Sequence, residues 1–285
     1  MTTTIRFGLS TCPNDTFAYH GLLTGKVDTR GLDFDCVLLD VQELNDGAAR
    51  GEYDVAKASF HAALLLAGEY GVLPVGSALG FGVGPLLLAS RPGVTPEDLP
   101  EGRVLCPGAQ TTATLLYELF HRGCGRVEHA VFDRIMPALA SGDADFGVCI
   151  HEGRFTYERE GLHLVEDLGT RWESETGAPL PLGGILARHD LGVDVHACVT
   201  EVLRDSLAYA AAHLDETFVT MRQHAQELDD DVIQAHVDLY VNDWTHDLGD
   251  VGRKALDEMS TRARDIGLLD ESAAALRILG EASHA

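Results

Sequence analysis

The first half of the chain alternates short apolar runs with segments in which apolar residues recur at helical spacing. The apolar runs predict strands at residues 4–9, 32–40, 53–58 and 72–78, and the segments between them predict helices. Alternation of this kind is typical of a mainly parallel sheet with helices on both faces. We therefore expect the chain to begin with an α/β unit.

A glycine-rich segment at residues 80–86 separates this unit from a second series of strands and helices, with strands predicted at residues 86–90, 104–107, 128–132 and 145–150. The segment resembles a dinucleotide-binding loop only superficially, because Pro85 and an apolar strand follow it where such a loop needs a helix. Glycine tolerates the backbone angles that a crossover between two lobes requires, and this is the interpretation we favour. Beyond about residue 194 the pattern is helical only.

These patterns predict an α/β protein of two lobes with a helical C-terminal segment. The first and larger lobe is expected to contain residues 1–86 and 205–285, and the second lobe residues 87–204. In open α/β sheets, ligands bind where the carboxyl ends of strands face the N-termini of helices. We therefore expect a ligand-binding cleft between the two lobes.

The chain is strongly acidic, with 45 acidic against 21 basic residues and a formal net charge of −24. This charge repels nucleic-acid phosphates and anionic lipids, so neither a nucleic acid nor a membrane is an expected partner. The N-terminus shows no signal-peptide pattern, and the six cysteines form no CxxC pair. We expect a cytoplasmic protein with reduced thiols and no metal site, while the oligomeric state stays open.

His151 directly follows the strand predicted at residues 145–150. His151 and Glu152 begin like the helix of a zinc protease, but the second histidine four residues later is missing, so zinc is not expected. A histidine at the carboxyl end of a strand can act as an acid–base group, because free imidazole titrates near neutral pH. A structural histidine is the alternative. The other histidines, His236 among them, show no pattern that assigns a role, and no Cys/His signature indicates a nucleophile.

Residues 107–114 form a predicted strand–turn–helix junction that is rich in hydroxyl side chains. The amides and partial positive charge at a helix N-terminus suit a carboxylate, which indicates a small carboxylated substrate. A threonine N-cap without a ligand is the alternative. Lys57 ends another predicted strand, where it is either a cleft cation or a surface charge, and Asn14 and Asp15 are candidate helix caps.

Six segments between about residues 6 and 245 carry a family resemblance when they are taken together and in order. They are Thr-Cys-Pro-Asn-Asp-Thr-Phe at 11–17, Lys-Ala-Ser at 57–59, Gly-Val-Gly-Pro-Leu at 82–86, Pro-Gly at 107–108 with Thr-Thr-Ala at 111–113, His-Glu-Gly-Arg-Phe-Thr-Tyr at 151–157 and Leu-Pro-Leu-Gly-Gly at 180–184. The sequence resembles the family of 1,4-dihydroxy-6-naphthoate synthases, enzymes of the futalosine route to menaquinone. Thr11 stands where we expect proline in this family, a departure that should be harmless.

The resemblance implies a two-lobed fold of the type II periplasmic-binding-protein kind, used inside the cell as an enzyme. The implied activity is that of a carbon–carbon lyase, which converts cyclic dehypoxanthine futalosine to 1,4-dihydroxy-6-naphthoate with no metal or organic cofactor. The family's general base matches His151. Its substrate-contacting segments match Lys57, Ala58, Ser59, Thr111, Thr112, Ala113 and Thr114.

Two other functions stay open on the sequence. Chorismate dehydratase of the same pathway acts on an enolpyruvyl-type substrate with a similar fold, although the Cys-Pro-Asn-Asp and His-Glu-x-Arg elements favour the lyase. A non-catalytic small-solute-binding protein would share the fold but would need export, and no signal segment is visible. If His151 is not the general base, Lys57 is the next candidate.

Overall fold

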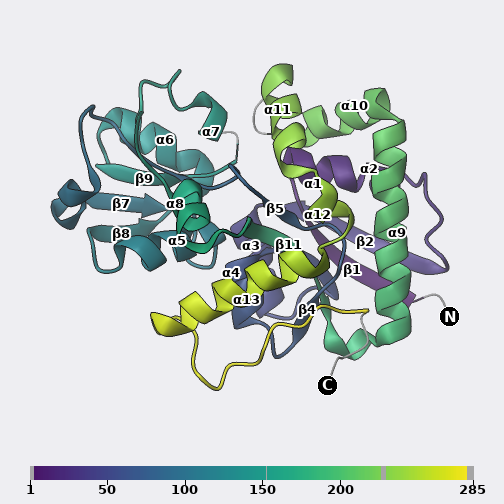
Figure 1. Ribbon diagram of the computed structural model, residues 1–285. Helices are drawn as coiled ribbons and strands as arrows, with labels where there is room; N and C mark the ends of the chain where they lie inside the picture. Colours follow the sequence, from purple (N-terminus) through teal and green to yellow (C-terminus); the bar gives the residue numbers. More distant parts are fainter. Residues whose placement is uncertain (1–2, 152, 226–228, 281–285) are drawn as a thin grey trace.

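The chain forms two β-sheets that lie side by side, each covered by helices (Figure 1). The computed structural model describes residues 3–151, 153–225 and 229–280. The larger sheet has the strand order β2-β1-β3-β11-β4, with β5 paired to β11. Its strands are β1 (Thr3–Ser10), β2 (Leu32–Leu39), β3 (Val55–Ser59), β4 (Tyr70–Val72), β5 (Ala78–Gly80) and β11 (Leu180–Arg188).

The smaller sheet has the strand order β10-β6-β9-β7-β8. Both sheets have a parallel part, β1 with β2 and β3 in one and β7 with β8 and β9 in the other, joined to antiparallel strands. The strands of the smaller sheet are β6 (Leu86–Ala89), β7 (Arg103–Cys106), β8 (Arg126–His129), β9 (Phe146–Cys149) and β10 (His163–Asp167). The predicted α/β architecture of two lobes is therefore confirmed.

Helices follow most strands and cover the sheets. Those of the first part of the chain are α1 (Pro13–Ala18), α2 (His20–Leu23), α3 (Val41–Ala49) and α4 (Phe60–Leu65). The smaller lobe contributes the 3₁₀ helix at Pro96–Glu101, α5 (Thr112–His121), α6 (Phe132–Ser141), α7 (Gly153–Thr156) and α8 (Leu168–Thr176).

The C-terminal part of the chain is helical, as predicted, and returns to the larger lobe. After a 3₁₀ turn at His189–Leu191, α9 packs against α2, and α10 packs against α1. Figure 1 shows α13 running beneath both lobes, where it contacts β11 and α5. These helices are α9 (Val193–Ala212), α10 (Leu214–His224), α11 (Asp230–Tyr240), α12 (Asp243–His246) and α13 (Gly249–Asp265).

One hydrophobic cluster runs through both lobes. It contains Leu44 and Phe60 of the larger lobe together with Leu115, Phe146 and Trp172 of the smaller one, all of them buried. Strands β3, β6 and β9 are buried along their whole length, as expected for strands with side chains packed on both faces. The relative position of the lobes is therefore set by a shared apolar core.

Two predicted strands differ from those observed. The segment predicted as one strand at residues 72–78 is divided into β4 and β5, because the chain turns at Gly76, where φ is +83°. The strand predicted at residues 128–132 ends at His129, and α6 begins at Phe132 because Ile135 and Leu139 lie at helical spacing and are both buried.

The start of the first helix also differs from the prediction. Asn14 and Asp15 were candidate caps, but Cys12 occupies the N-cap position and Pro13 the first helical position. Proline is favoured there because its fixed φ suits a helix. An N–H at this position would have no intrahelical acceptor, so proline loses no hydrogen bond by lacking it. Asn14 and Asp15 therefore lie inside the helix, and their buried side chains can form hydrogen bonds in the protein interior.

Strand β11 belongs to the larger sheet, although residues 87–204 were predicted as the second lobe. The chain returns from the smaller lobe after α8, and β11 pairs antiparallel with β3. Gly183 allows this close approach, since a Cβ at this position would lie 2.7 Å from the Ala58 carbonyl oxygen.

The crossover into the smaller lobe depends on contact between two glycines. A Cβ on Gly84 would lie 2.2 Å from the Gly169 Cα, and backbone atoms cannot move aside cheaply. We expect Gly84→Ala to lower the free energy of unfolding by about 1–3 kcal/mol in urea denaturation. Gly68→Ala is the control, because nothing lies within 4 Å of a Cβ there. Equal stability of the two variants would contradict the proposed backbone contact.

Candidate functional site

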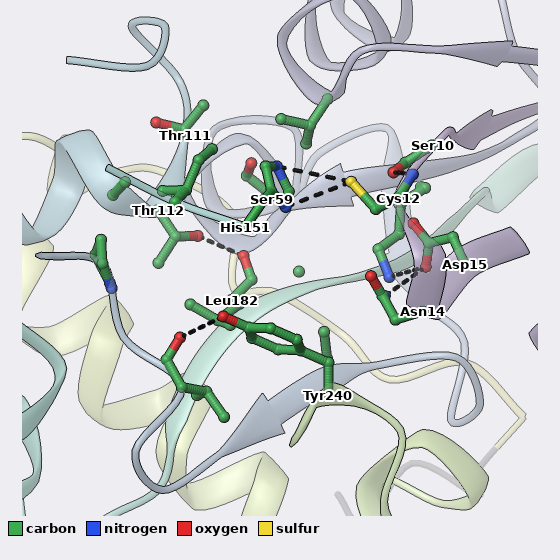
Figure 2. A pocket seen from close by; sticks show the side chains of 18 of the residues that line it. Ser10, Cys12, Asn14, Asp15, Ser59, Thr111, Thr112, His151, Leu182 and Tyr240 are labelled. Carbon is green, nitrogen blue, oxygen red and sulfur yellow. Dashed lines mark hydrogen bonds and ion pairs between the residues drawn. The ribbon is translucent and has the colours of Figure 1, made fainter. Parts of the chain in front are cut away.

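A cavity opens between the two sheets, beyond the carboxyl ends of β1, β3 and β9 (Figure 2). Together with its mouth, which is open to solvent, it encloses about 690 Å³ of space. Most of the site residues predicted from the sequence line it: His151, Lys57, Ala58, Ser59, Thr111, Thr112 and Ala113. Residues that are far apart in the chain and come from both lobes are thus brought to one cavity.

The His151 side chain extends into this cavity from the turn after β9 (Figure 2). Its φ of +56° lies in the left-handed region, which residues other than glycine occupy uncommonly and which often marks functional sites. The ring of Phe132 meets the His151 ring edge-on at 4.9 Å between centroids. On the larger lobe, the His236 ring stacks on it at 6.2 Å and 22°. The ring is therefore held by aromatic contacts from both lobes.

Lys57 is a buried cation with a matched partner. Its Nζ lies 2.6 Å from the Asp15 carboxylate, and the two side chains are only 7% and 3% exposed. Nζ also donates to the Gly76 carbonyl oxygen at 3.3 Å. Of the two sequence interpretations, the structure excludes a surface charge. Because Asp15 accepts its hydrogen bond, Lys57 brings little net positive charge to the cavity.

Ala58 and Ser59 follow Lys57 at the end of β3. The Ser59 amide donates to Asn45 Oδ1 at 3.0 Å, and Asn45 Nδ2 donates to Ser59 Oγ at 3.3 Å. This reciprocal pair joins α3 to β3. It fixes the carboxyl end of the strand, and with it the backbone that faces the cavity.

The threonines at the start of α5 use their hydroxyl groups within the protein. Thr111 caps the helix by accepting from the Thr114 amide at 3.3 Å, and Thr114 Oγ1 donates to the Gly108 carbonyl oxygen at 2.6 Å. Thr112 Oγ1 donates to the Leu182 carbonyl oxygen at 2.6 Å. What faces the cavity is the first turn of the helix, where the amides of Thr112 and Ala113 have no intrahelical acceptor. Thr114 lies behind this turn and supports it.

Polar contacts cross between the lobes at the edge of the cavity. The Thr112 bond to Leu182 joins α5 to β11, and His61 Nδ1 lies 3.2 Å from the Thr111 carbonyl oxygen. Arg154 donates to the Gly84 carbonyl oxygen of the crossover at 2.7 Å, and within the smaller lobe it pairs with Asp167 at 2.8 Å. These contacts join the two lobes in the arrangement that the structure shows.

His236 is a site residue that the sequence did not reveal. It is 1% exposed, and burial, together with nearby His151 and Lys57, holds its pKa well below the usual range. Asn14 Nδ2 donates to the Asp15 carboxylate at 3.0 Å, so Asn14 Oδ1 is left to accept from His236 Nε2 at 2.9 Å. His236 is therefore neutral near pH 7, with its proton on Nε2. Its only signal in the sequence is helical spacing with Ile233 and Tyr240, which indicates a buried face.

Cys12 is the second residue that the sequence did not reveal. Its Sγ lies 3.4 Å from His151 Nδ1 and 3.7 Å from Nε2, although the two residues are separated by 139 positions in the chain. No Cys/His pattern at a fixed spacing could have indicated this pair.

Within residues 3–151, 153–225 and 229–280, no three His, Cys, Asp or Glu side chains gather as ligands for a metal ion. The helices there are too short or too polar for any of them to cross a membrane.

The chain is similar over almost its whole length to proteins of known name. The sequence model of a family described as menaquinone biosynthesis matches residues 5–265. A 1,4-dihydroxy-6-naphthoate synthase of Thermus thermophilus is 45% identical over 264 residues, which cover 93% of this chain and 95% of that protein. A synthase of the same name from Streptomyces coelicolor is 38% identical over 271 residues, with the same coverage of 93% and 95%.

Solved structures agree with this. A crystal structure of an Archaeoglobus fulgidus protein matches with a TM-score of 0.88 at 33% identity, covering 93% of this chain and 98% of that one. The alkanesulfonate-binding protein of Xanthomonas axonopodis matches with a TM-score of 0.74 at 14% identity, covering 95% and 96%. The second likeness shows the fold alone, and it confirms the predicted periplasmic-binding-protein-like fold. Because the sequence matches extend over more than nine tenths of its length, the chain belongs to the family of 1,4-dihydroxy-6-naphthoate synthases in menaquinone biosynthesis.

Proposed function

We propose that this protein is a carbon–carbon lyase that converts cyclic dehypoxanthine futalosine to 1,4-dihydroxy-6-naphthoate in the cytoplasm. The observation that carries the proposal is the position of His151, which lines the same cavity as the first turn of α5. One element offers a base and the other offers hydrogen-bond donors for a carboxylate. The relatives at 45% and 38% identity are named for the synthesis of the same naphthoate, which supports it as the product.

His151 acts as the general base in this proposal. A neutral imidazole takes the proton of a substrate hydroxyl group, whose oxygen then forms a carbonyl in the departing sugar-derived fragment. The electron pair of the broken carbon–carbon bond enters the ring system, and the proton returns to the oxygen of the new phenol. Aromatisation of the product supplies the driving force. Closed lobes exclude water and hold the substrate in one conformation.

The substrate carboxylate is placed at the first turn of α5. The amides of Thr112 and Ala113 point along the helix axis, and the partial positive charge of the N-terminus attracts an anion. Such a local site is needed because the formal net charge of the protein is −24. Lys57, with Ala58 and Ser59, lines the wall of the larger lobe and contacts the substrate as part of β3.

Lys57 is the weaker candidate for the general base. Loss of its proton would leave the buried Asp15 carboxylate without its ammonium partner at 2.6 Å, and an unpaired buried charge is costly. Its place in the proposal is therefore structural and electrostatic, whereas His151 contacts the thiol of Cys12 and the rings of Phe132 and His236.

One assay of the purified protein distinguishes the proposed lyase from two other functions. A chorismate dehydratase would release water from an enolpyruvyl-type substrate, and a solute-binding protein would bind without turnover. The likeness to the alkanesulfonate-binding protein, at 14% identity, concerns the fold alone. Incubation of the purified protein with cyclic dehypoxanthine futalosine, followed by mass spectrometry, should give the naphthoate. Formation of a dehydrated product from chorismate alone, or of no product from either substrate, would overturn the proposal.

His151→Asn should lower turnover by roughly 10²–10⁴, because it removes the base. Asparagine adopts left-handed backbone angles readily, so the φ of +56° should be preserved. The substrate should still raise the melting temperature of the variant, since binding stabilises the folded state.

The matched control is His129→Asn, which changes an exposed histidine at the end of β8 in the same lobe. It should retain wild-type turnover. If His151→Asn keeps more than about a tenth of the wild-type rate, a loss smaller than a missing general base produces, the assignment of the base is wrong. A variant that does not fold would instead make His151 a structural residue.

Thr112→Pro should raise KM by roughly 10- to 100-fold, because it removes one amide from the proposed carboxylate site. Thr112 is the first residue of α5, where proline is compatible with a helix, and Thr111 has φ −79° and ψ 151°, which suit a residue before proline. Thr112→Ala is the control, since it loses the bond to Leu182 but keeps the amide, and it should weaken binding only modestly. Equal KM values for the two variants would count against backbone recognition.

A further inference from the structure

The thiol of Cys12 reaches the proposed base from the opposite lobe. Cys12 belongs to the turn between β1 and α1, whereas His151 follows β9 of the smaller sheet. Figure 2 shows the sulfur directed at the edge of the imidazole ring that carries both nitrogens. Nδ1 is the nearer of the two, at 3.4 Å, and the contact joins the two lobes.

The backbone around Cys12 holds the thiol in place. Its amide donates to Ser10 Oγ at 3.0 Å, and its carbonyl oxygen accepts from the amides of Asp15 and Thr16, each at 3.0 Å. Pro13 occupies the first position of the helix and fixes φ there. Neighbouring bonds therefore limit where this side chain can point.

The aromatic contacts of the His151 ring leave one property undetermined, namely which of its two nitrogens carries the proton. The His236 ring stacks on one face and the Phe132 ring packs against it, so tilting is restricted. Stacking on a face does not distinguish the two nitrogens of an imidazole or decide which of them carries the proton. A hydrogen-bond partner at the nitrogen edge does so.

We propose that Cys12 is a positioning residue for His151. Its thiol forms a hydrogen bond with one ring nitrogen and thereby fixes the tautomer and the orientation in which the other nitrogen meets the substrate. Because the two residues come from different lobes, the packing of the lobes against each other completes the base. This inference rests on the proposed function of His151, and it adds a residue that acts through it.

A thiol suits this position because it is a weak and neutral hydrogen-bonding group. A carboxylate in its place would stabilise the protonated imidazolium and oppose return of the proton to the product. The thiol orients the ring without adding charge. The same geometry would also suit a thiolate nucleophile activated by a histidine, and the experiment distinguishes the two roles.

The kinetic test compares Cys12→Ala, Cys12→Ser and Cys198→Ala with the wild type. Loss of one hydrogen bond should lower kcat by roughly 2- to 10-fold in Cys12→Ala while KM stays close to the wild-type value. Cys12→Ser offers a hydroxyl in place of the thiol and should recover part of the loss. Cys198→Ala, on α9 and away from the cavity, should leave both constants unchanged.

The second test is independent of turnover. In protein labelled with ¹⁵N-histidine, the ring nitrogens of His151 report its tautomer, and His151→Asn identifies their signals by loss. We expect these signals to move in Cys12→Ala and to stay in place in Cys198→Ala. Unchanged His151 signals in Cys12→Ala would overturn the inference, even if the proposed function holds.

A loss of more than about a thousandfold in both Cys12→Ala and Cys12→Ser would also overturn it, because a single positioning bond cannot supply such an effect. That result would make the thiol a nucleophile. If His151→Asn is fully active while Cys12→Ala moves the ring signals of His151, the assignment of the base fails, the positioning role fails with it, and only the contact stands.

Discussion

The buried ion pair between Lys57 and Asp15 organises the wall of the cavity. Two charges that are almost fully removed from water are tolerated only when they satisfy each other, so β3 and α1 must keep the separation that gives 2.6 Å between Nζ and the carboxylate. The pair then sets its neighbours: Asn14 donates to Asp15, and its oxygen accepts the proton of His236. A chain of polar groups thus runs from the sheet to the ring that stacks on His151.

This chain lies entirely in the larger lobe, and the histidine that it approaches lies in the smaller one. The lobes are joined by the hydrophobic cluster and by polar contacts such as that of Thr112 with Leu182. The wall of the larger lobe that faces His151 therefore consists of a matched ion pair and of polar groups that hydrogen-bond to one another. Such a wall can position a reacting group through its shape and its contacts.

The sequence predicted the fold well where residues repeat with a clear period. Strands β1, β2, β3, β6, β7 and β9 follow apolar runs, and the family resemblance indicated His151 and the start of α5. Strand β10 and helix α8 were not predicted, because many of their side chains are half-exposed and show little periodicity. His236 and Cys12 could not be assigned, since their partners lie 222 and 139 residues away and only the closed fold brings them together.

The left-handed backbone at His151 also restricts the ways in which this position can change during evolution. A single base change in a histidine codon leads to Asn, Asp, Tyr, Leu, Pro, Arg or Gln. Proline cannot adopt φ +56°, and of the others only Asn and Asp are markedly enriched in that region. A single base change therefore preserves this turn mainly when it replaces His151 by Asn or Asp. The backbone of the turn and the genetic code together limit the substitutions of His151 that leave the turn undisturbed, independently of any selection on the chemistry.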